Sequence, residues 1–174
     1  MLVASGDIWG RRGRRATVGG GRGMMLAQLA IAAGVTAITI VMHAAAMTAV
    51  VYVVRLLSEL LRRSQRAVRV AHGVTVAGVL LMFAHIAEVL VWGGVYRLIG
   101  MTSNPDDAFY FAFVNYTTLG YGDMVPVPHW RLLGPMTAAD GILLFGLSTA
   151  ALFHVIVATG TPHPEGDVTI PPRP

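Results

Sequence analysis

The sequence has no cysteine among its 174 residues, and all thirteen of its basic residues are arginine, so lysine is absent as well. The lack of cysteine excludes a disulfide framework and a thiolate metal site. Charged residues make up only 13% of the chain, whereas hydrophobic residues make up 55%. This balance is too apolar for an ordinary water-soluble protein, and it predicts one membrane-embedded domain. The exclusive use of arginine is typical of a GC-rich, bacterial genome.

Several functional signatures are missing too. No nucleophile is paired with a base, so we expect neither an enzyme nor a bound cofactor. No nucleic-acid-binding motif accompanies the net charge of +4, which we attribute to arginines at the cytoplasmic membrane surface. The first long apolar run lacks arginines at three-residue spacing, which argues against a voltage sensor. The short stretch after residue 159 leads us to expect no nucleotide- or calcium-binding domain there.

Three apolar runs are long enough to cross a hydrocarbon core of roughly 30 Å, which takes about 20 helical residues. They cover approximately residues 24–54, 70–97 and 132–159. The second run ends with Trp92 and Tyr96, which we expect at the membrane–water interface. The Gly/Arg-rich residues 1–23 are predicted to be a disordered leader, and residues 160–174 a short cytoplasmic tail.

Residues 55–69 form a basic, amphipathic continuation of the first run, with leucines on one face. We expect it to prolong the helix along the membrane surface, so that residues 24–69 form one peripheral unit. A basic anchoring loop is the favoured interpretation, and binding of anionic lipid is the alternative. The arginines concerned are Arg55, Arg62, Arg63, Arg66 and Arg69.

A short helix is predicted over residues 105–116. Asn104 is a suitable N-cap, Pro105 suits the first helical position, and Asp106 and Asp107 favour the first turn. Twelve residues span about 18 Å at 1.5 Å per residue, or roughly half a membrane. A helix of half length is typical of a re-entrant segment, whose irregular exit is tolerated where it lines a water-filled path.

The string that follows, Tyr-Thr-Thr-Leu-Gly-Tyr-Gly-Asp over residues 116–123, is the most unusual part of the sequence. Gly120 and Gly122 tolerate positive φ, which allows successive carbonyls to point the same way. A row of carbonyls coordinates a monovalent cation without trapping it as carboxylates would. The Thr118 hydroxyl adds one more oxygen at the inner end.

This string resembles the selectivity filter of potassium channels, with Leu119 where their pattern has valine. Residues 70–159 as a whole resemble small bacterial channels built from two helices and a pore loop. The resemblance implies an outer helix (70–97), a pore helix (105–116), a filter (117–123) and an inner helix (132–159). We therefore predict an all-α membrane protein with three transmembrane helices plus a re-entrant pore helix and filter loop between the second and third.

The resemblance further implies passive, K⁺-selective transport by a homotetramer, because a carbonyl cage needs four chains. The filter residues would be Thr118, Leu119, Gly120, Tyr121 and Gly122, with Asp123 lending negative potential at the outer mouth. Val114 stands where some channels carry a glutamate behind the filter, so that brace is absent. A non-conducting, channel-like subunit or membrane sensor is the alternative.

His85 and Glu88 are the polar pair inside the second run, three residues apart and therefore on one helical face. Glu88 is expensive in hydrocarbon and must face protein or water. One hypothesis is that it braces the pore helix or filter and tunes gating through protonation. The favoured one is a hydrogen-bonded interhelical pair. A metal site that includes His43 is conceivable.

Three further residues lie on the third run. Asp140 is expected behind the filter or at an interface. Gly146 matches the hinge glycine of potassium-channel inner helices by position, and close helix packing is the alternative. His154 fits either a pH-sensing gate or, preferably, an interfacial histidine.

The predicted orientation in the inner membrane places the filter loop outside and residues 55–69 in the cytoplasm, as the positive-inside rule favours. With one span before that loop, the arginine-rich N-terminus lies outside, which conflicts with the same rule. Our hypothesis is that residues 1–23 are often not made, and that Met24 or Met25 is the working start.

Overall fold

The three apolar runs form three long helices in the computed structural model, which describes residues 18–160, with side chains from Arg22 onward. These helices are α1 (Val18–Leu60), α2 (Arg66–Leu98) and α4 (Leu133–Gly160). Between α2 and α4 lie the short helix α3 (Ala108–Tyr116) and the 3₁₀ turns η1 (Pro105–Asp107) and η2 (Pro128–Trp130). The part of the chain that is described contains no strand, and the predicted all-α fold is confirmed.

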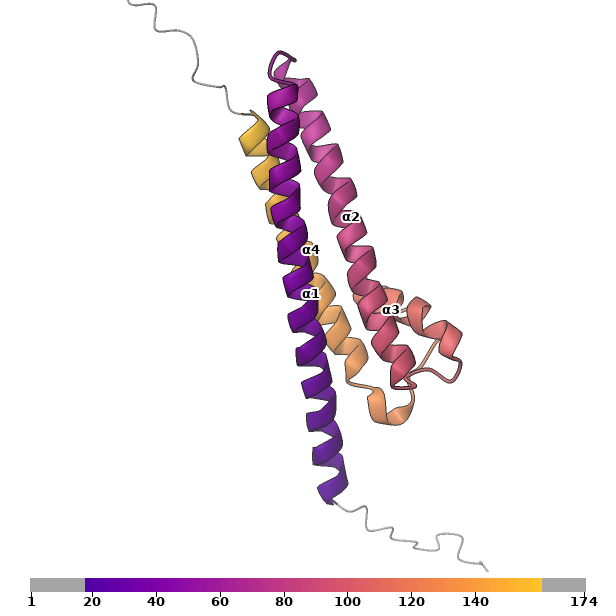
Figure 1. Cartoon of the computed structure of the whole chain (residues 1–174). Helices are drawn as coiled ribbons and strands as arrows, with labels where there is room; N and C mark the ends of the chain where they lie inside the picture. Colours follow the sequence, from indigo (N-terminus) through magenta and orange to yellow (C-terminus); the bar gives the residue numbers. More distant parts are fainter. Residues whose placement is uncertain (1–17, 161–174) are drawn as a thin grey trace, which may run out of the picture.

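Helix α1 differs from the prediction at both ends. It begins at Val18 and not at residue 24, so the last part of the predicted leader is helical. It then continues straight through Arg55 to Leu60 without turning aside along a surface (Figure 1). Its 43 residues span about 65 Å, which is more than a membrane core requires. Residues 1–17 of the predicted leader lie outside the described residues.

A tight turn joins α1 to α2, so the two helices run antiparallel (Figure 1). The Arg69 guanidinium closes this turn by donating to the backbone oxygens of Ser64 at 3.0 Å and Arg62 at 3.4 Å. Arg66 and Arg69 therefore belong to the first turn of α2 and not to the connection. The connection between α1 and α2, residues 61–65, is thus shorter than the basic stretch of residues 55–69.

Helix α4 packs against both α1 and α2, and its last turn reaches the end where those two helices meet (Figure 1). At Gly73 of α2, an added Cβ would lie 3.1 Å from Thr159, so the glycine permits close packing there. At the opposite end, the backbone N–H of Leu132 donates to the Gln28 side chain of α1 at 2.9 Å. The N-terminal end of α1 thus lies at the same end as α3 and its loop. The tail from residue 161 lies outside the described residues.

The sequence predicted Trp92 and Tyr96 at the membrane–water interface, but the structure buries both side chains fully inside the protein. Both lie on the face of α2 that packs against α4. The Trp92 indole donates to Asp140 at 2.8 Å, and the Tyr96 hydroxyl lies 2.6 Å from the Thr137 hydroxyl. Their polar atoms are thus satisfied inside the protein, so that the rings need no contact with the membrane surface.

The predicted start of the short helix is present with one difference. The Asn104 side chain accepts from the Asp106 backbone N–H at 3.2 Å. The first turn is a 3₁₀ turn, however, so the α-helix itself begins at Ala108. At Gly93 of α2 a Cβ would collide with the Phe109 ring, so this glycine admits α3 against α2.

The helices α1, α2 and α4 are each long and apolar enough to cross a membrane. The chain is therefore a multi-pass membrane protein with a short helix and loop inserted between its second and third spans.

Candidate functional site

The loop at residues 117–123 leaves the C-terminal end of α3. Three backbone hydrogen bonds finish that helix: Thr117 N–H donates to Phe113, Thr118 to Asn115, and Leu119 to Val114, at 3.0, 2.9 and 2.9 Å. The carbonyl end of a helix carries partial negative charge. The start of the loop therefore lies where a cation is favoured.

The loop has alternating backbone handedness. Thr118, Gly120 and Gly122 have φ of +59°, +56° and +77°. Thr118 is the one residue other than glycine with positive φ in the described part of the chain, and Leu119 and Tyr121 between them keep negative φ. Alternation of this kind turns successive peptide planes in the same sense, so that carbonyls line up. The two glycines supply the conformation that the sequence predicted for them.

The loop is uncovered in a single chain. Leu119 is 53% exposed and Tyr121 is 67% exposed, although both side chains are large and apolar in part. Beside them a cavity of about 210 Å³ opens between α3, the loop and the start of α4. Its lining includes Asn115, Gly120 and Gly134. None of the residues that the structure describes fills this space or covers these side chains.

Asp123 ends the loop and is held by α3. The Tyr110 hydroxyl donates to its carboxylate at 2.7 Å. This hydrogen bond raises the pKa of Tyr110 above its usual 10, because the neutral hydroxyl is the form that donates. Val114 is buried and apolar, so no carboxylate stands at that position behind the loop.

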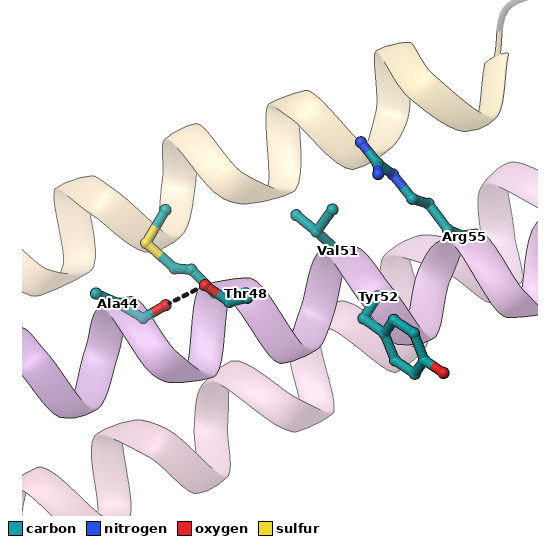
Figure 2. A pocket seen from close by; sticks show the side chains of 6 residues that line it. Ala44, Thr48, Val51, Tyr52 and Arg55 are labelled. Atoms are coloured by element: carbon teal, nitrogen blue, oxygen red, sulfur yellow. Dashed lines mark hydrogen bonds between the residues drawn. The ribbon is translucent and has the colours of Figure 1, made fainter.

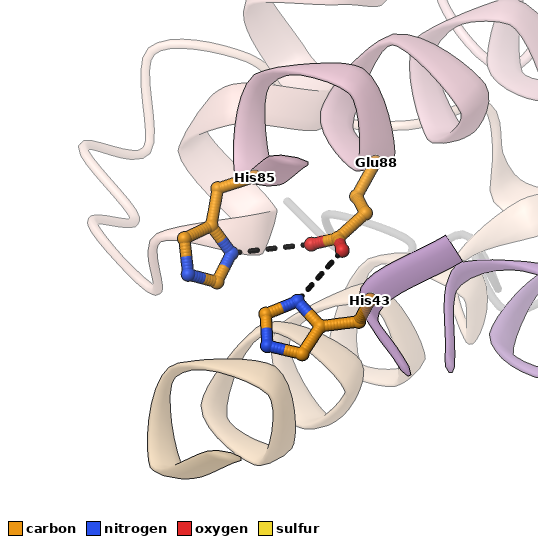
Figure 3. Close-up of side chains that lie close together, drawn as sticks. All are labelled: His43, His85 and Glu88. Carbon is orange, nitrogen blue, oxygen red and sulfur yellow. Dashed lines mark hydrogen bonds and ion pairs between the residues drawn. The ribbon is translucent and has the colours of Figure 1, made fainter. Parts of the chain in front are cut away.

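Glu88 lies behind the loop, fully buried between two histidines (Figure 3). His43 Nδ1, from α1, lies 2.9 Å from Glu88 Oε1. His85 Nδ1, one turn before Glu88 on α2, lies 3.1 Å from Oε2. Both rings present the same nitrogen to one carboxylate. The predicted His85–Glu88 pair is present, and His43 joins it.

Two hydroxyl groups complete this cluster. Tyr116, the last residue of α3, donates to Glu88 Oε2 at 2.5 Å, and its oxygen lies 2.8 Å from His85 Nδ1. Ser148 of α4 lies 2.9 Å from His85 Nε2 and 3.2 Å from His43 Nε2. Side chains from all four helices thus form a closed ring, which we call the polar ring: His43, His85, Glu88, Tyr116 and Ser148. The contact that the bracing hypothesis requires, from Glu88 to the residue before the loop, is present.

Asp140 lies next to the polar ring. Its Oδ2 accepts from Thr39 of α1 and from Trp92 of α2, both at 2.8 Å. Its Oδ1 is buried and has no hydrogen-bond partner among the described residues. Thr39 and Trp92 are each four residues from a ring member, His43 and Glu88, so Asp140 sits about one helical turn away. Its carboxylate thus links α1 and α2, and its predicted place behind the filter or at an interface stays a prediction.

The two glycines of α4 differ. A Cβ at Gly141 would collide with the carbonyl oxygen of Tyr116, so α4 and the end of α3 touch backbone to backbone there. At Gly146 no described atom lies within 4 Å of such a Cβ. Close packing at Gly146 is therefore not made within one chain, and the hinge hypothesis stays a prediction. His154 is exposed on α4.

Sequence reasoning missed Thr39, Ser148 and the role of the Tyr116 hydroxyl. One signal was available on α1, where polar and small residues recur on a single helical face. The buried residues of that face are Gln28, Ala32, Val35, Thr39, His43, Val50 and Val54. Three of these seven are polar, which is unusual for a lipid-facing helix and indicates docking against protein.

A second, apolar groove of about 540 Å³ lies along the C-terminal half of α1 (Figure 2). Met47, Val51 and Tyr52 contribute to its lining, and Arg55 stands at its end. Thr48 donates to the Ala44 carbonyl of its own helix at 2.9 Å and offers little polarity. The groove places apolar surface beside one of the arginines predicted to bind anionic lipid, and that lipid contact stays a prediction.

Comparison with known proteins matches residues 84–158 to a family described as "Ion channel". The human voltage-gated potassium channel regulatory subunit KCNG4 is 31% identical over 114 residues, or 60% of this chain and 22% of that protein. The Potassium voltage-gated channel subfamily A member 2 of Canis lupus familiaris is 38% identical over 77 residues, or 40% of this chain and 15% of that protein.

The chain thus spans less than a quarter of the length of these curated relatives. No solved structure matches it significantly. The matched region begins just before His85 and contains α3, the loop and nearly all of α4. The comparisons support a relationship between residues 84–158 and the potassium channels, a class of proteins that are not enzymes.

Proposed function

We propose that this chain forms a K⁺-selective pore as a homotetramer, with the loop at residues 117–123 as its filter. The observation that carries the proposal is the alternating handedness at Thr118, Gly120 and Gly122, at the end of a half-membrane helix. The similarity of residues 84–158 to an ion channel family supports it independently.

Selectivity for K⁺ follows from the row of backbone carbonyls at residues 118–121, which we call the strip. The carbonyls of Thr118, Leu119, Gly120 and Tyr121 replace the hydration shell of the ion, and Gly122 allows the chain to leave the strip. The negative end of α3 favours a cation at the inner end of the strip. Asp123, held by Tyr110, adds negative potential at the outer mouth.

The proposed tetramer follows from two features of the single chain: its carbonyls surround an ion on one side only, and apolar side chains beside them are exposed. One strip supplies oxygens from one side only, so several strips must surround the ion. Leu119 and Tyr121 need neighbours to cover their apolar surface, and the cavity of about 210 Å³ beside them needs filling. Copies of the same chain, related by an axis along the pore, meet both needs.

In the proposed orientation the filter faces outward and the arginine-rich turn between α1 and α2 faces the cytoplasm of a bacterial cell. Because Gln28 contacts the start of α4, the N-terminal end of α1 then also faces outward. The charge conflict in the sequence therefore has a structural counterpart. A shortened N-terminus that starts at Met24 or Met25 removes it.

Ion flux into proteoliposomes tests the proposal, with K⁺ and Na⁺ compared for wild type and Gly120→Ala. Gly120 has φ of +56°, where alanine costs about 1–2 kcal/mol per residue, in each of the four chains. We expect K⁺ flux well above Na⁺ flux in wild type, and loss of selective flux in the variant. Gly78→Ala is the control, because it makes the same change on α2 where no described atom lies within 4 Å. Equal K⁺ and Na⁺ flux in wild type would contradict the proposal.

The second candidate is a non-conducting subunit or sensor. One observation favours it: two of the similar proteins, from Homo sapiens and Mus musculus, are named as regulatory subunits. A tetramer that is folded but passes no K⁺ would support this candidate over the pore.

A further inference from the structure

We propose that His43, His85 and Glu88 form a buried binding site for a late first-row divalent metal ion, with Zn²⁺ as the fitting example, and that this ion ties α1 to the pore region. The three ligand atoms, one from each residue, all lie within 4.8 Å of one another. The inference stands apart from K⁺ conduction, since metal is measured directly on the protein.

The ligand set has the chemistry of such a site. Imidazole nitrogens suit Zn²⁺, Co²⁺ and their neighbours, whereas Mg²⁺ and Ca²⁺ prefer oxygen alone. The side chains of His43 and Glu88 are fully buried, and that of His85 is 9% exposed. Both Nδ1 atoms face the same carboxylate, at 2.9 and 3.1 Å (Figure 3).

The ligand atoms must draw closer together around one ion. Zinc bonds to nitrogen and oxygen of about 2.0–2.1 Å place tetrahedral ligand atoms about 3.3 Å apart. The two nitrogen–oxygen distances of 2.9 and 3.1 Å involve the two different oxygens of Glu88, and the three ligand atoms lie within 4.8 Å of one another. The Tyr116 oxygen lies 2.8 Å from His85 Nδ1 and 2.5 Å from Glu88 Oε2, so a further oxygen is present beside these two ligand atoms.

The hydrogen-bond inventory of the polar ring favours a cation there. An ionised carboxylate only accepts, and Tyr116 donates its hydrogen to Glu88, so each Nδ1 that faces Glu88 carries a hydrogen of its own in this arrangement. Both Nε2 atoms of neutral rings are then acceptors. Ser148 has a single hydroxyl hydrogen, yet it lies within hydrogen-bond distance of both Nε2 atoms. Neutral histidines therefore leave the ring one hydrogen short.

A metal ion on both Nδ1 atoms removes this shortage. Each imidazole hydrogen then resides on Nε2, and the two N–H groups donate to the two lone pairs of Ser148 Oγ. Metal-binding histidines usually donate their second N–H to a polar partner in this way. Tyr116 meanwhile donates to the Glu88 oxygen. Both Nε2 atoms and the Glu88 carboxylate then have partners.

The neighbouring charge agrees as well. A divalent ion with one carboxylate and two neutral histidines carries a net charge of +1, which needs compensation away from water. Asp140 lies one helical turn away, is 3% exposed, and has a buried Oδ1 without a partner among the described residues. Because His43 comes from α1, the site is complete only when α1 has docked.

Titration of Co²⁺ into full-length protein, purified without a polyhistidine tag, tests the inference. We expect saturable visible absorption of the kind that tetrahedral Co²⁺ gives, at one ion per chain, reversed by Zn²⁺. Elemental analysis should find the same stoichiometry after growth with zinc. Ser148→Ala keeps all three ligands and should weaken metal affinity by about 10–100-fold.

Glu88→Gln and His43→Gln should abolish the signal, whereas His154→Gln, which changes an exposed histidine of α4, should leave it unchanged. The Ser148→Ala measurement keeps the test informative if a ligand variant fails to fold. Folded wild type without saturable Co²⁺ absorption would overturn the inference, and an extra proton would then complete the ring. Equal binding by Glu88→Gln and wild type would overturn it too.

Discussion

At Gly141, α4 presents bare backbone to the carbonyl of Tyr116, the residue that ends α3. Tyr116 is also held from the other side by Glu88 through its hydroxyl. One residue is thus fixed at its backbone by α4 and at its side chain by α2. The loop that follows therefore begins at a residue whose backbone and side chain are both held in place.

We expect Gly141→Ala to destabilise the protein, because the added methyl would collide with the Tyr116 carbonyl and neither backbone can move freely. Overpacking of this kind costs about 1–3 kcal/mol. The thermal unfolding midpoint in one detergent should fall below that of Gly34→Ala, which adds the same methyl to α1 where no described atom lies within 4 Å. Equal midpoints would show that the contact at Gly141 is loose.

At this scale the sequence predicts what depends on neighbouring residues. The Asn104 cap and the positive φ of Gly120 and Gly122 follow from local backbone chemistry, and they are present. The polar ring depends on residues far apart: Ser148 follows His43 by 105 positions. No local pattern joins such residues, so the sequence predicted Glu88 with His85, named His43 only for a metal site, and missed Ser148 and the Tyr116 hydroxyl.

At the scale of elements, α1 is bound to α2 and α4 by polar side chains and not only by apolar packing. Its polar contacts run from Gln28 near the start of α4, through Thr39 on Asp140, to His43 in the polar ring. These lie on one face of α1, along the stretch from Gln28 to His43. Helix α1 is therefore bound to the region that matches the ion channel family, although the match begins at residue 84 and does not include α1 itself.

Thr39→Val should weaken this docking. Valine keeps the shape but removes the hydroxyl that donates to the buried Asp140 carboxylate at 2.8 Å. Hydrogen bonds to charged groups contribute about 1.5–3 kcal/mol. We expect a lower unfolding midpoint and faster proteolysis of α1 than in Thr48→Val, whose hydroxyl is exposed and bonds within its own helix. If the two variants behave alike, Asp140 is satisfied without Thr39.

Two differences between the predicted and observed helices have physical reasons: the start of α1 and the burial of Trp92 and Tyr96. Helix α1 begins at Val18, inside a glycine-rich stretch that disfavours helix residue by residue. Each added residue of an existing helix gains a hydrogen bond, however, so a long helix extends into poor sequence. Trp92 and Tyr96 suit either a membrane surface or a core. Their partners on α4, Asp140 and Thr137, decide for the core.

At the scale of the whole molecule, the structure fixes relative positions, and charge fixes the side of the membrane. The turn between α1 and α2 and the end of α4 lie at one end, and the loop at residues 117–123 and the N-terminal end of α1 lie at the other (Figure 1). The arginines of the first end should hold it in the cytoplasm. They are Arg55, Arg62, Arg63, Arg66 and Arg69.

Because the chain has no cysteine, single cysteines can report this orientation without background. We expect Ser103→Cys, beside the pore helix, and Ala27→Cys, near the exposed start of α1, to react with a membrane-impermeant maleimide in intact spheroplasts. Gln65→Cys, in the turn, should react only after permeabilisation. All three positions lie after Met25, so the result does not depend on which methionine starts the chain. Reaction at Gln65 with protection at Ser103 would invert the orientation, and protection at Ala27 alone would mean that α1 is not antiparallel to α2 in the membrane.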